Sequence, residues 1–296
     1  MNIEQFTYDV LDDLKYNPSI CLVSQRGGGK SFLLDSLMKY LDKKYKYSHI
    51  FAFSQTDKIT GQMSSFVPDD FIFETLEPLQ QIIDTRLESN TPIEERSNIC
   101  IIMNDISGLR ERNTYNKDSK SIKNSGNLEK LFSLGRHQLR CTVILLLQSL
   151  VMVTPLIRYN SDITFFWTPK SSIVRKKITD EYLGLVSRKE AIQVYEDVFD
   201  GTPYQCLVIN SWIQGTTKLN EFVFKFLAPV QKKWKSGFVK RNGKPKKKKK
   251  ANIKPNKKNN IFSIYNVNEV KTDRLRTETN PIRSKKRTKA SKLSAY

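Results

Sequence analysis

The chain has 296 residues, a formal net charge of +20 and a hydrophobic content of 39%. This length suits one large domain with an extension, and the apolar fraction can supply a sizeable core. The charge is uneven: residues 231–296 hold 23 Lys or Arg against 3 Asp or Glu, whereas residues 1–230 hold 27 of each sign. The basic excess therefore belongs to the C-terminal segment.

Neither a signal peptide nor a membrane-spanning helix is expected. The first residues are acidic and contain no apolar signal core. The longest apolar stretch, "CTVILLLQSLVMVTPLI", is interrupted by Gln148, Ser149 and Pro155. It falls short of the ~20 apolar residues that a spanning helix needs. We therefore expect a soluble protein without a membrane partner.

Four cysteines lie in or beside apolar runs, and none forms a C-x-x-C pair: Cys21, Cys100, Cys141 and Cys206. Isolated cysteines in apolar surroundings are typical of buried, reduced thiols in an intracellular protein. We favour this interpretation over a metal site or a disulfide.

Apolar runs and amphipathic segments alternate along the chain. Short apolar runs predict buried strands, and helical spacing predicts helices between them. The strands are expected at 19–25, 49–56, 98–105, 141–148 and 162–169, and the helices at 31–45, 78–89, 126–138, 172–184 and 187–199. Two late runs, 204–212 and 221–229, predict a hairpin at the sheet edge. The order predicts an α/β fold, a mainly parallel sheet with helices on both faces.

The first predicted strand ends in the glycine-rich segment "VSQRGGGKSF" (residues 23–32). Gly29, Lys30 and Ser31 match the end of the phosphate-binding pattern G-x-x-x-x-G-K-[ST], whereas Ser24 occupies the position of its first glycine. That departure matters if the position needs a positive φ. Because a strand precedes the loop and a helix follows it, we favour a nucleotide-binding loop over a glycine-rich turn without a ligand.

The residue types of this loop suit a nucleoside triphosphate with its metal ion. Gly27, Gly28 and Gly29 let successive amide groups face one anion, and the N-terminus of the following helix adds partial positive charge. Lys30 would reach the β- and γ-phosphates, and Ser31 would bind Mg²⁺ through its hydroxyl. The expected cofactors are ATP and Mg²⁺.

Polar residues end the third and fourth strands. Asp105 stands where P-loop NTPases hold Mg²⁺ or polarise the attacking water, although many strands end in Asp for turn chemistry. Gln148 could orient water or sense the γ-phosphate, or could be a strand-end amide with its own partner. Asn104 is unexpected, since an amide cannot act as a base and binds Mg²⁺ less well than a carboxylate. We predict Asp105 and Gln148 as catalytic residues, with Ser31 and Asp105 at the metal.

Arg136 closes the helix that precedes the fourth strand, next to His137. An arginine near the nucleotide edge of one subunit can stabilise charge on the ATP of a neighbour. A cation at a helix C-terminus can equally complement the helix dipole. We count Arg136 as a candidate catalytic residue on the first interpretation and keep the second open.

The segments "KYKYSHIFAFSQ", "IIMNDI" and above all "LFSLGRHQLRCTVILLLQ", followed by "VTP", together resemble one family. It is the poxvirus-type genome-packaging ATPases of the FtsK/HerA lineage of P-loop motors, found in large DNA viruses, virophages and related elements. The resemblance covers roughly residues 18–170. It implies a homo-oligomeric ring that pumps double-stranded DNA into a preformed capsid, with viral capsid or vertex proteins as further partners.

The family usually carries two adjacent acids after the third strand. Asn104 stands at the first, the metal-side acid, and Asp105 at the second, the catalytic one. The resemblance therefore implies that Asp105 activates water, while Mg²⁺ binding rests more on Ser31 and the phosphates. It also implies a location inside an infected host cell, at a viral assembly site or in the nucleus, and in the virion.

The sequence leaves other functions open. A nucleotide-switched DNA-binding or capsid-docking protein with weak ATPase activity is the main alternative, because Asn104 departs from the family pattern. A small-molecule kinase is disfavoured by the block that contains Arg136 and Gln148 and by the absence of an evident Arg-rich lid segment.

We expect an ATPase domain at 1–230 and a basic, disordered tail at 231–296. The lysines of the tail can neutralise DNA phosphates without reading bases, although a merely solvating tail or a nuclear-localisation patch has the same composition. The apolar island at 260–267 is either a stray patch or a docking motif.

Overall fold

The structure, a computed structural model, describes residues 3–14, 16–104, 126–184, 186–213, 216 and 218–242. Two predicted features lie outside the described residues: Asp105, and the chain from residue 243 onwards, including the island at 260–267. All four cysteines are buried and free, as expected.

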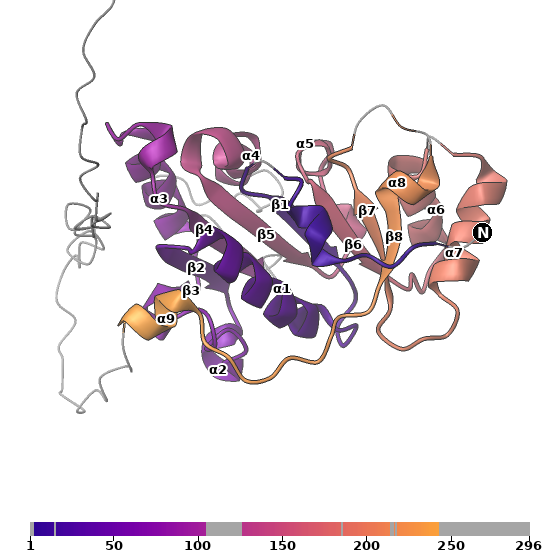
Figure 1. Cartoon of the computed structure of the whole chain (residues 1–296), viewed down its shortest axis with the longest axis horizontal. Coiled ribbons are helices and arrows are strands. Elements are labelled where there is room, and N and C mark those ends of the chain that lie inside the picture. The colour runs from indigo at the N-terminus through magenta and orange to yellow at the C-terminus, as the bar shows by residue number, and fades with distance from the viewer. Residues whose placement is uncertain are drawn as a thin grey trace, which may run out of the picture. The chain divides into compact units, whose positions relative to one another are not determined.

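An eight-stranded sheet with the order β3-β2-β4-β5-β1-β6-β7-β8 organises the chain (Figure 1). The strands from β3 to β6 in this order run parallel, whereas β7 and β8 are antiparallel to their neighbours. The bounds are β1 Ser19–Val23, β2 His49–Ser54, β3 Ile72–Phe73, β4 Ile99–Asn104, β5 Cys141–Leu147, β6 Ile163–Trp167, β7 Cys206–Asn210 and β8 Val223–Phe226. The predicted α/β fold and edge hairpin are confirmed; the short β3 was not predicted.

The bounds of the helices are α1 Lys30–Tyr45, α2 Asp57–Thr60, α3 Glu77–Leu87, α4 Gly126–Leu134, α5 Pro155–Tyr159, α6 Ser172–Tyr182, α7 Arg188–Val198, α8 Leu219–Phe222 and α9 Gly237–Asn242. The five predicted helices are present close to their predicted ranges, as α1, α3, α4, α6 and α7, whereas the short α2, α5, α8 and α9 were not predicted. A π-helical turn, η6, extends α4 over Gly135–Leu139. Side-chain hydroxyls cap several N-termini; α7 begins with a capping box of Ser187 and Glu190.

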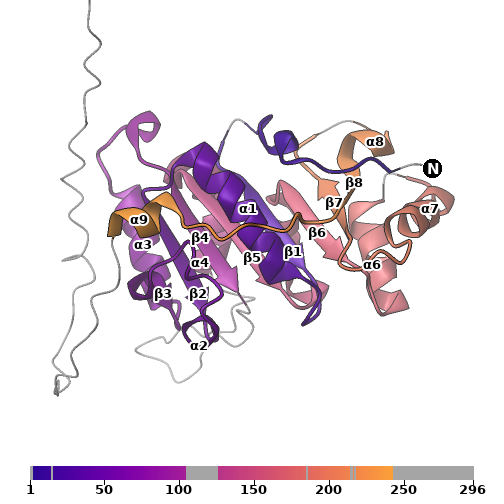
Figure 2. The same ribbon diagram turned by 60° about the horizontal axis from the view of Figure 1, so that its bottom comes forward.

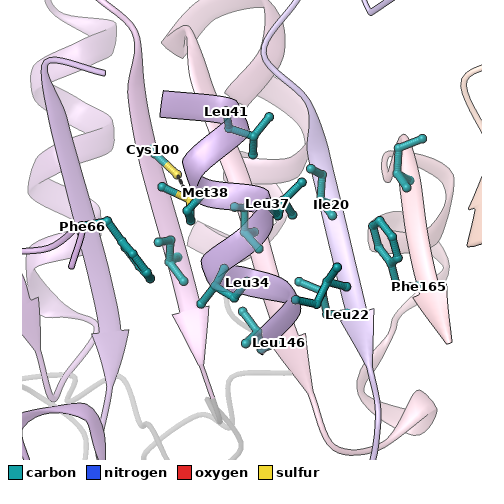
Figure 3. Close-up of a cluster of buried hydrophobic side chains, with 14 of the residues drawn as sticks. Ile20, Leu22, Leu34, Leu37, Met38, Leu41, Phe66, Cys100, Leu146 and Phe165 are labelled. Atoms are coloured by element: carbon teal, nitrogen blue, oxygen red, sulfur yellow. Dashed lines mark hydrogen bonds between the residues drawn. The ribbon is translucent and has the colours of Figure 1, made fainter. Parts of the chain in front are cut away.

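One face of the sheet is covered by α1. Its apolar side packs on the central strands because Leu33, Leu34, Leu37 and Leu41 recur at helical spacing. Figure 3 shows the buried side chains of α1 over those of β1 and β5: Leu34, Leu37, Leu41, Ile20, Leu22 and Leu146. This contact fixes the start of α1 at the carboxyl end of β1, where the glycine-rich loop joins them.

The opposite face is covered by α4, its π-helical turn and α6. A Cβ atom on Gly135 would lie 3.3 Å from Cγ2 of Val143, so only a glycine allows η6 to approach β5 this closely without displacing Val143. Further along the sheet, the rings of Phe166 in β6 and Tyr182 in α6 meet edge to face at 4.7 Å. Helices therefore cover both faces, as predicted.

Residues 227–242 form a strap that leaves β8, crosses α1 and ends beside β2 and β3 (Figures 1 and 2). Trp234 donates through Nε1 to Oδ1 of Asp35 at 2.9 Å and stacks on Phe66. The Gly237 amide donates to Oδ2 of Asp42 at 2.8 Å. Phe238 is 1% exposed in the core. The strap thus belongs to the folded unit.

The strap corrects the expected boundary at residue 230. A segment rich in lysine was expected to have little to bury, but Trp234 and Phe238 supply apolar side chains at two points along it. Arg241 also donates to the Tyr47 carbonyl at 2.6 Å. The folded unit therefore extends at least to Asn242, beyond the expected boundary.

Removal of the strap should destabilise the domain. We expect the 1–230 protein to lose about 3 kcal/mol or more in the free energy of unfolding relative to the 1–242 protein, since fully burying one large apolar side chain contributes about 1.5–3 kcal/mol. Urea unfolding of both proteins measures the difference. Phe238→Ala should reproduce much of the loss, whereas Val230→Ala, which alters an 85% exposed side chain of the same strap, should not. Equal stability of the two truncated proteins would contradict this role.

Candidate nucleotide-binding site

The glycine-rich loop joins the carboxyl end of β1 to the first residue of α1. Gly27 has φ 78° and Gly29 has φ 104°, both in the left-handed region that favours glycine. Gly29 is also the N-cap of α1, so the loop turns directly into the helix N-terminus. This backbone presents the amide groups and helix dipole that bind anions.

Ser24 does not need the conformation that a glycine would provide. Among the described residues, the non-glycine positions with positive φ are Lys46, Arg140 and Tyr204, so Ser24 is outside that region. Its amide donates to the Leu147 carbonyl of β5 at 3.0 Å and continues the parallel pairing. The departure from the loop pattern at Ser24 is therefore compatible with the fold of the loop.

The Ser24 side chain occupies the space that a side chain on Gly28 would need. A Cβ atom on Gly28 would lie 1.8 Å from Ser24 Oγ and 3.1 Å from Ser24 Cβ. The Ser24 hydroxyl also donates to the Gln25 carbonyl at 3.1 Å, so moving it away would break that bond. Ser24 at the position of the first glycine thus favours a glycine four residues later, because a side chain on Gly28 would displace the Ser24 hydroxyl.

This competition for space predicts a rescue. Gly28→Ala should lower the free energy of unfolding by about 1–3 kcal/mol through overpacking. Ser24→Gly with Gly28→Ala should recover most of that loss, because the clashing side chain is gone. Urea unfolding of both single variants and the double variant gives the coupling energy. Additive effects in this cycle would show that the two positions do not compete for space.

Lys30 and Ser31 occupy the first positions of α1. The buried Lys30 ammonium donates to the carbonyl oxygens of Ser24 and Gln25, so the side chain folds back across the loop. The exposed Ser31 hydroxyl donates to Oε1 of Gln62 at 2.9 Å. An accessible hydroxyl at this helix start fits Mg²⁺, which usually takes one or two protein oxygens together with phosphates and water. The contact with Gln62 was not predicted.

A hollow of about 200 Å³ opens beside the loop. The described residues that line it include two cations and no acid, which favours an anionic ligand. Its lining comprises Ser24, Gln25, Arg26, Gly27, Gly28, Trp167, Thr168, Lys170, Tyr204 and Gln205. Sequence reasoning missed the second half of this list, because residues after β6 and before β7 meet the loop only in the folded sheet.

Asn104 and Gln148 reach the same edge of the sheet from the other side of β1. β5 lies between β1 and β4, and Asn104, the last residue of β4, pairs with Leu146 of β5. Asn104 is buried, whereas Gln148 is exposed and directly follows Leu147, the partner of Ser24. The structure therefore brings Gln148 next to the start of the loop and places Asn104 one strand further away; a catalytic role for Gln148 stays a prediction.

Arg136 lies at the opposite edge of the sheet, where the parallel strands have their amino ends. It pairs with Asp162, which immediately precedes β6, and its guanidinium stacks on Trp212 at 4.8 Å. Asp162 also accepts from the amide of Ser19, the first residue of β1, at 2.7 Å. The five residues of β1, with a rise of about 3.3 Å per residue along the strand, separate this edge from the loop. Arg136 is therefore remote from the loop of its own chain, and its action on a neighbouring subunit stays a proposal.

The contacts of Arg136 give it a structural role in its own chain. Asp162 is 3% exposed, and burial raises the pKa of its carboxyl although the Ser19 amide and Arg136 oppose the shift. The π-helical turn carries Arg136 to this acid. Neither Asp162 nor Trp212 was singled out from the sequence; an acid at the amino end of a buried strand is the signal that could have indicated the pair.

Arg136→Ala should lower the free energy of unfolding by about 3 kcal/mol, because it leaves the Asp162 carboxylate buried without its cation. Adding Asp162→Asn should recover part of the loss, since the uncharged amide can still accept from the Ser19 amide. A double-mutant cycle in urea measures the coupling. No recovery in the double variant would mean that the pair does not hold the strand starts together.

The central strand, the loop at its carboxyl end and the helix that follows define a P-loop NTPase fold. No protein-family model matches the chain. It is 26% identical over 227 residues to the uncharacterized protein L437 of Acanthamoeba polyphaga mimivirus, covering 75% of this chain and 76% of that protein. It is 24% identical over 225 residues to the uncharacterized protein 088R of Invertebrate iridescent virus 3, covering 75% and 79%. The chain is thus a distant relative of proteins from two DNA viruses.

Solved structures of viral NTPases also align with the chain. The genome packaging NTPase B204 of Sulfolobus turreted icosahedral virus 2, in complex with ATP-gammaS, is 13% identical, with a TM-score of 0.49 over 73% of this chain and 98% of that one. B204 of Sulfolobus turreted icosahedral virus is described as a DNA-packaging ATPase; it is 12% identical, with a TM-score of 0.45 over 71% and 97%. Within the described ranges, no helix is long and apolar enough to cross a membrane.

Proposed function

We propose that this chain hydrolyses ATP to move double-stranded DNA into a preformed viral capsid. The observation that carries the ATPase part is the loop itself, in which left-handed Gly27 and Gly29 lead into the N-terminus of α1 beside Lys30. The hollow next to it, whose described lining holds Arg26 and Lys170 and no acid, supports an anionic ligand. The DNA part rests on the sequence resemblance to packaging ATPases and on the basic tail.

The residues of the loop have separate roles in this proposal. The loop amides and the helix N-terminus bind the phosphates, and Lys30 exchanges the carbonyl oxygens of Ser24 and Gln25 for phosphate oxygens. Ser31 would hold Mg²⁺, which neutralises charge on the β- and γ-phosphates when bound. Gln148 orients the attacking water from the end of β5, and Asp105 activates it.

The tail supplies the DNA contacts. Residues 243–296 hold 18 Lys or Arg and 3 Asp or Glu, so they carry +15 of the net charge of +20. Lysines at this density bind phosphates through counterion release, without sequence preference and with strong salt dependence. The last described residues before the tail, 237–242, form α9, where Arg241 donates to the Tyr47 carbonyl.

ATP hydrolysis by the full-length protein, with and without double-stranded DNA, tests the proposal. We expect DNA to stimulate hydrolysis, and Lys30→Ala to abolish it because the phosphates lose their cation. Lys43→Ala removes an exposed lysine of the same helix and should leave the rate unchanged. A folded Lys30→Ala protein with wild-type activity would rule out this site.

The 1–242 protein serves as a second control for the DNA part. It retains the strap and the loop but lacks the tail, so we expect basal hydrolysis to persist and DNA stimulation to fall. Stimulation equal to that of the full-length protein would show that the DNA contacts lie elsewhere.

A nucleotide-switched DNA-binding or capsid-docking protein is the second candidate. Asn104 favours it, since this buried strand-end amide stands where the resembled family has a metal-side acid. Slow turnover with tight nucleotide binding would then be the native behaviour.

Variants at the end of β4 distinguish the two candidates. Asp105→Asn should keep ATP binding and lose turnover if Asp105 activates water, and Asn104→Asp should maintain or raise the rate. Single-turnover hydrolysis together with ATP affinity measures both effects. Unchanged turnover in Asp105→Asn would assign water activation to another residue.

A further inference from the structure

We propose that Tyr204, supported by Trp167, forms the wall on which the nucleoside part of the nucleotide lies. The inference rests on the proposed function, because it concerns the same ligand. It begins from the hollow beside the loop, where these two aromatic residues face Ser24, Arg26 and Gly28.

The sheet order separates two sides of the loop. On one side, Gln148 directly follows β5 and Asn104 ends β4, next to the expected hydrolytic chemistry. On the other side, β6 ends in Trp167, which pairs with Cys206 at the start of the antiparallel β7. Phosphates bound in the loop with the γ-phosphate toward β5 and β4 direct the nucleoside toward β6 and β7, where Tyr204 lies.

Tyr204 is held against the loop in an unusual conformation. Its φ is 64°, uncommon for a residue other than glycine, and its carbonyl accepts from Nε1 of Trp167 at 3.1 Å. A Cβ atom built on Gly29 would lie 3.4 Å from Cδ1 of Tyr204 and 3.4 Å from Nε1 of Trp167. Both aromatic residues thus adjoin the last glycine of the loop.

The Tyr204 side chain is nevertheless open to solvent. The residue is 64% exposed, whereas Trp167 is 8% exposed and acts as its buried support. Backbone strain in a folded protein often marks a functional constraint, here the presentation of a ring beside an anion site. Aromatic rings provide stacking surfaces for bases, and this works for any base because each has a π face. Arg26 and Lys170 in the same hollow favour an anionic ligand over a neutral one.

Comparison of ATP with inorganic tripolyphosphate tests this wall, since the second ligand has the phosphates without a nucleoside. Tyr204→Asn should raise the Kd for Mg²⁺-ATP about tenfold and leave the Kd for Mg²⁺-tripolyphosphate unchanged. Asparagine tolerates the left-handed backbone, so the variant removes the ring without adding strain. Tyr204→Phe keeps the ring and should bind ATP within about twofold of wild type.

Tyr159→Asn is the matched control, because it removes an 80% exposed tyrosine ring from α5, and both affinities should stay unchanged. Calorimetric titration of the full-length protein supplies all of the constants. Wild-type ATP affinity in Tyr204→Asn, or an equal loss for ATP and tripolyphosphate, would contradict the proposed contact between Tyr204 and the nucleoside. Neither result would contradict nucleotide binding at the loop. Wild-type protein that binds neither ligand would overturn the proposed function and the wall together.

Discussion

The parallel pairing of β1 with β5 and β6 is the constraint on which the candidate site depends. Its register places Val23 opposite both Leu147 and Phe166, so all three strands reach the loop edge together. The Ser24 amide extends this pairing to the Leu147 carbonyl. The loop therefore starts from a buried, fully paired strand, and the packing of α1 on the same strands fixes where it ends.

The carboxyl and amino ends of the parallel strands have different roles in this fold; we call them the carboxyl edge and the amino edge of the sheet. At the carboxyl edge, the loop and the aromatic residues Trp167 and Tyr204 line one anion-favouring hollow, and Gln148 follows β5 on the other side of β1. At the amino edge, Asp162 pairs with Arg136 of η6 and accepts from the Ser19 amide, so this ion pair links η6 to the starts of β6 and β1. Arg136 therefore already has a structural partner in its own chain, and this contact uses only one nitrogen of its guanidinium.

The strap shows how a basic terminal segment can be part of a folded domain. Trp234 and Phe238 anchor it, while the hydrogen bonds to Asp35 and Asp42 tie it along α1. Because α1 carries Lys30 and Ser31 at its first turn, the strap packs on the helix that presents the loop. The strap itself carries five Lys or Arg and no acid within residues 231–242, so a basic segment can still be anchored by its aromatic side chains.

The sequence by itself determined the class of fold and the loop. Apolar runs, helical spacing and the segment that ends in Gly29, Lys30 and Ser31 are local patterns, and local patterns can be recognised without knowing what packs against them. Only the tertiary structure decided the strand order, the ion pair of Arg136, the anchoring of the strap and the place of Tyr204 beside the loop. These features join residues far apart in the chain, and the contacts that stabilise them form only when the sheet brings its edges and faces together.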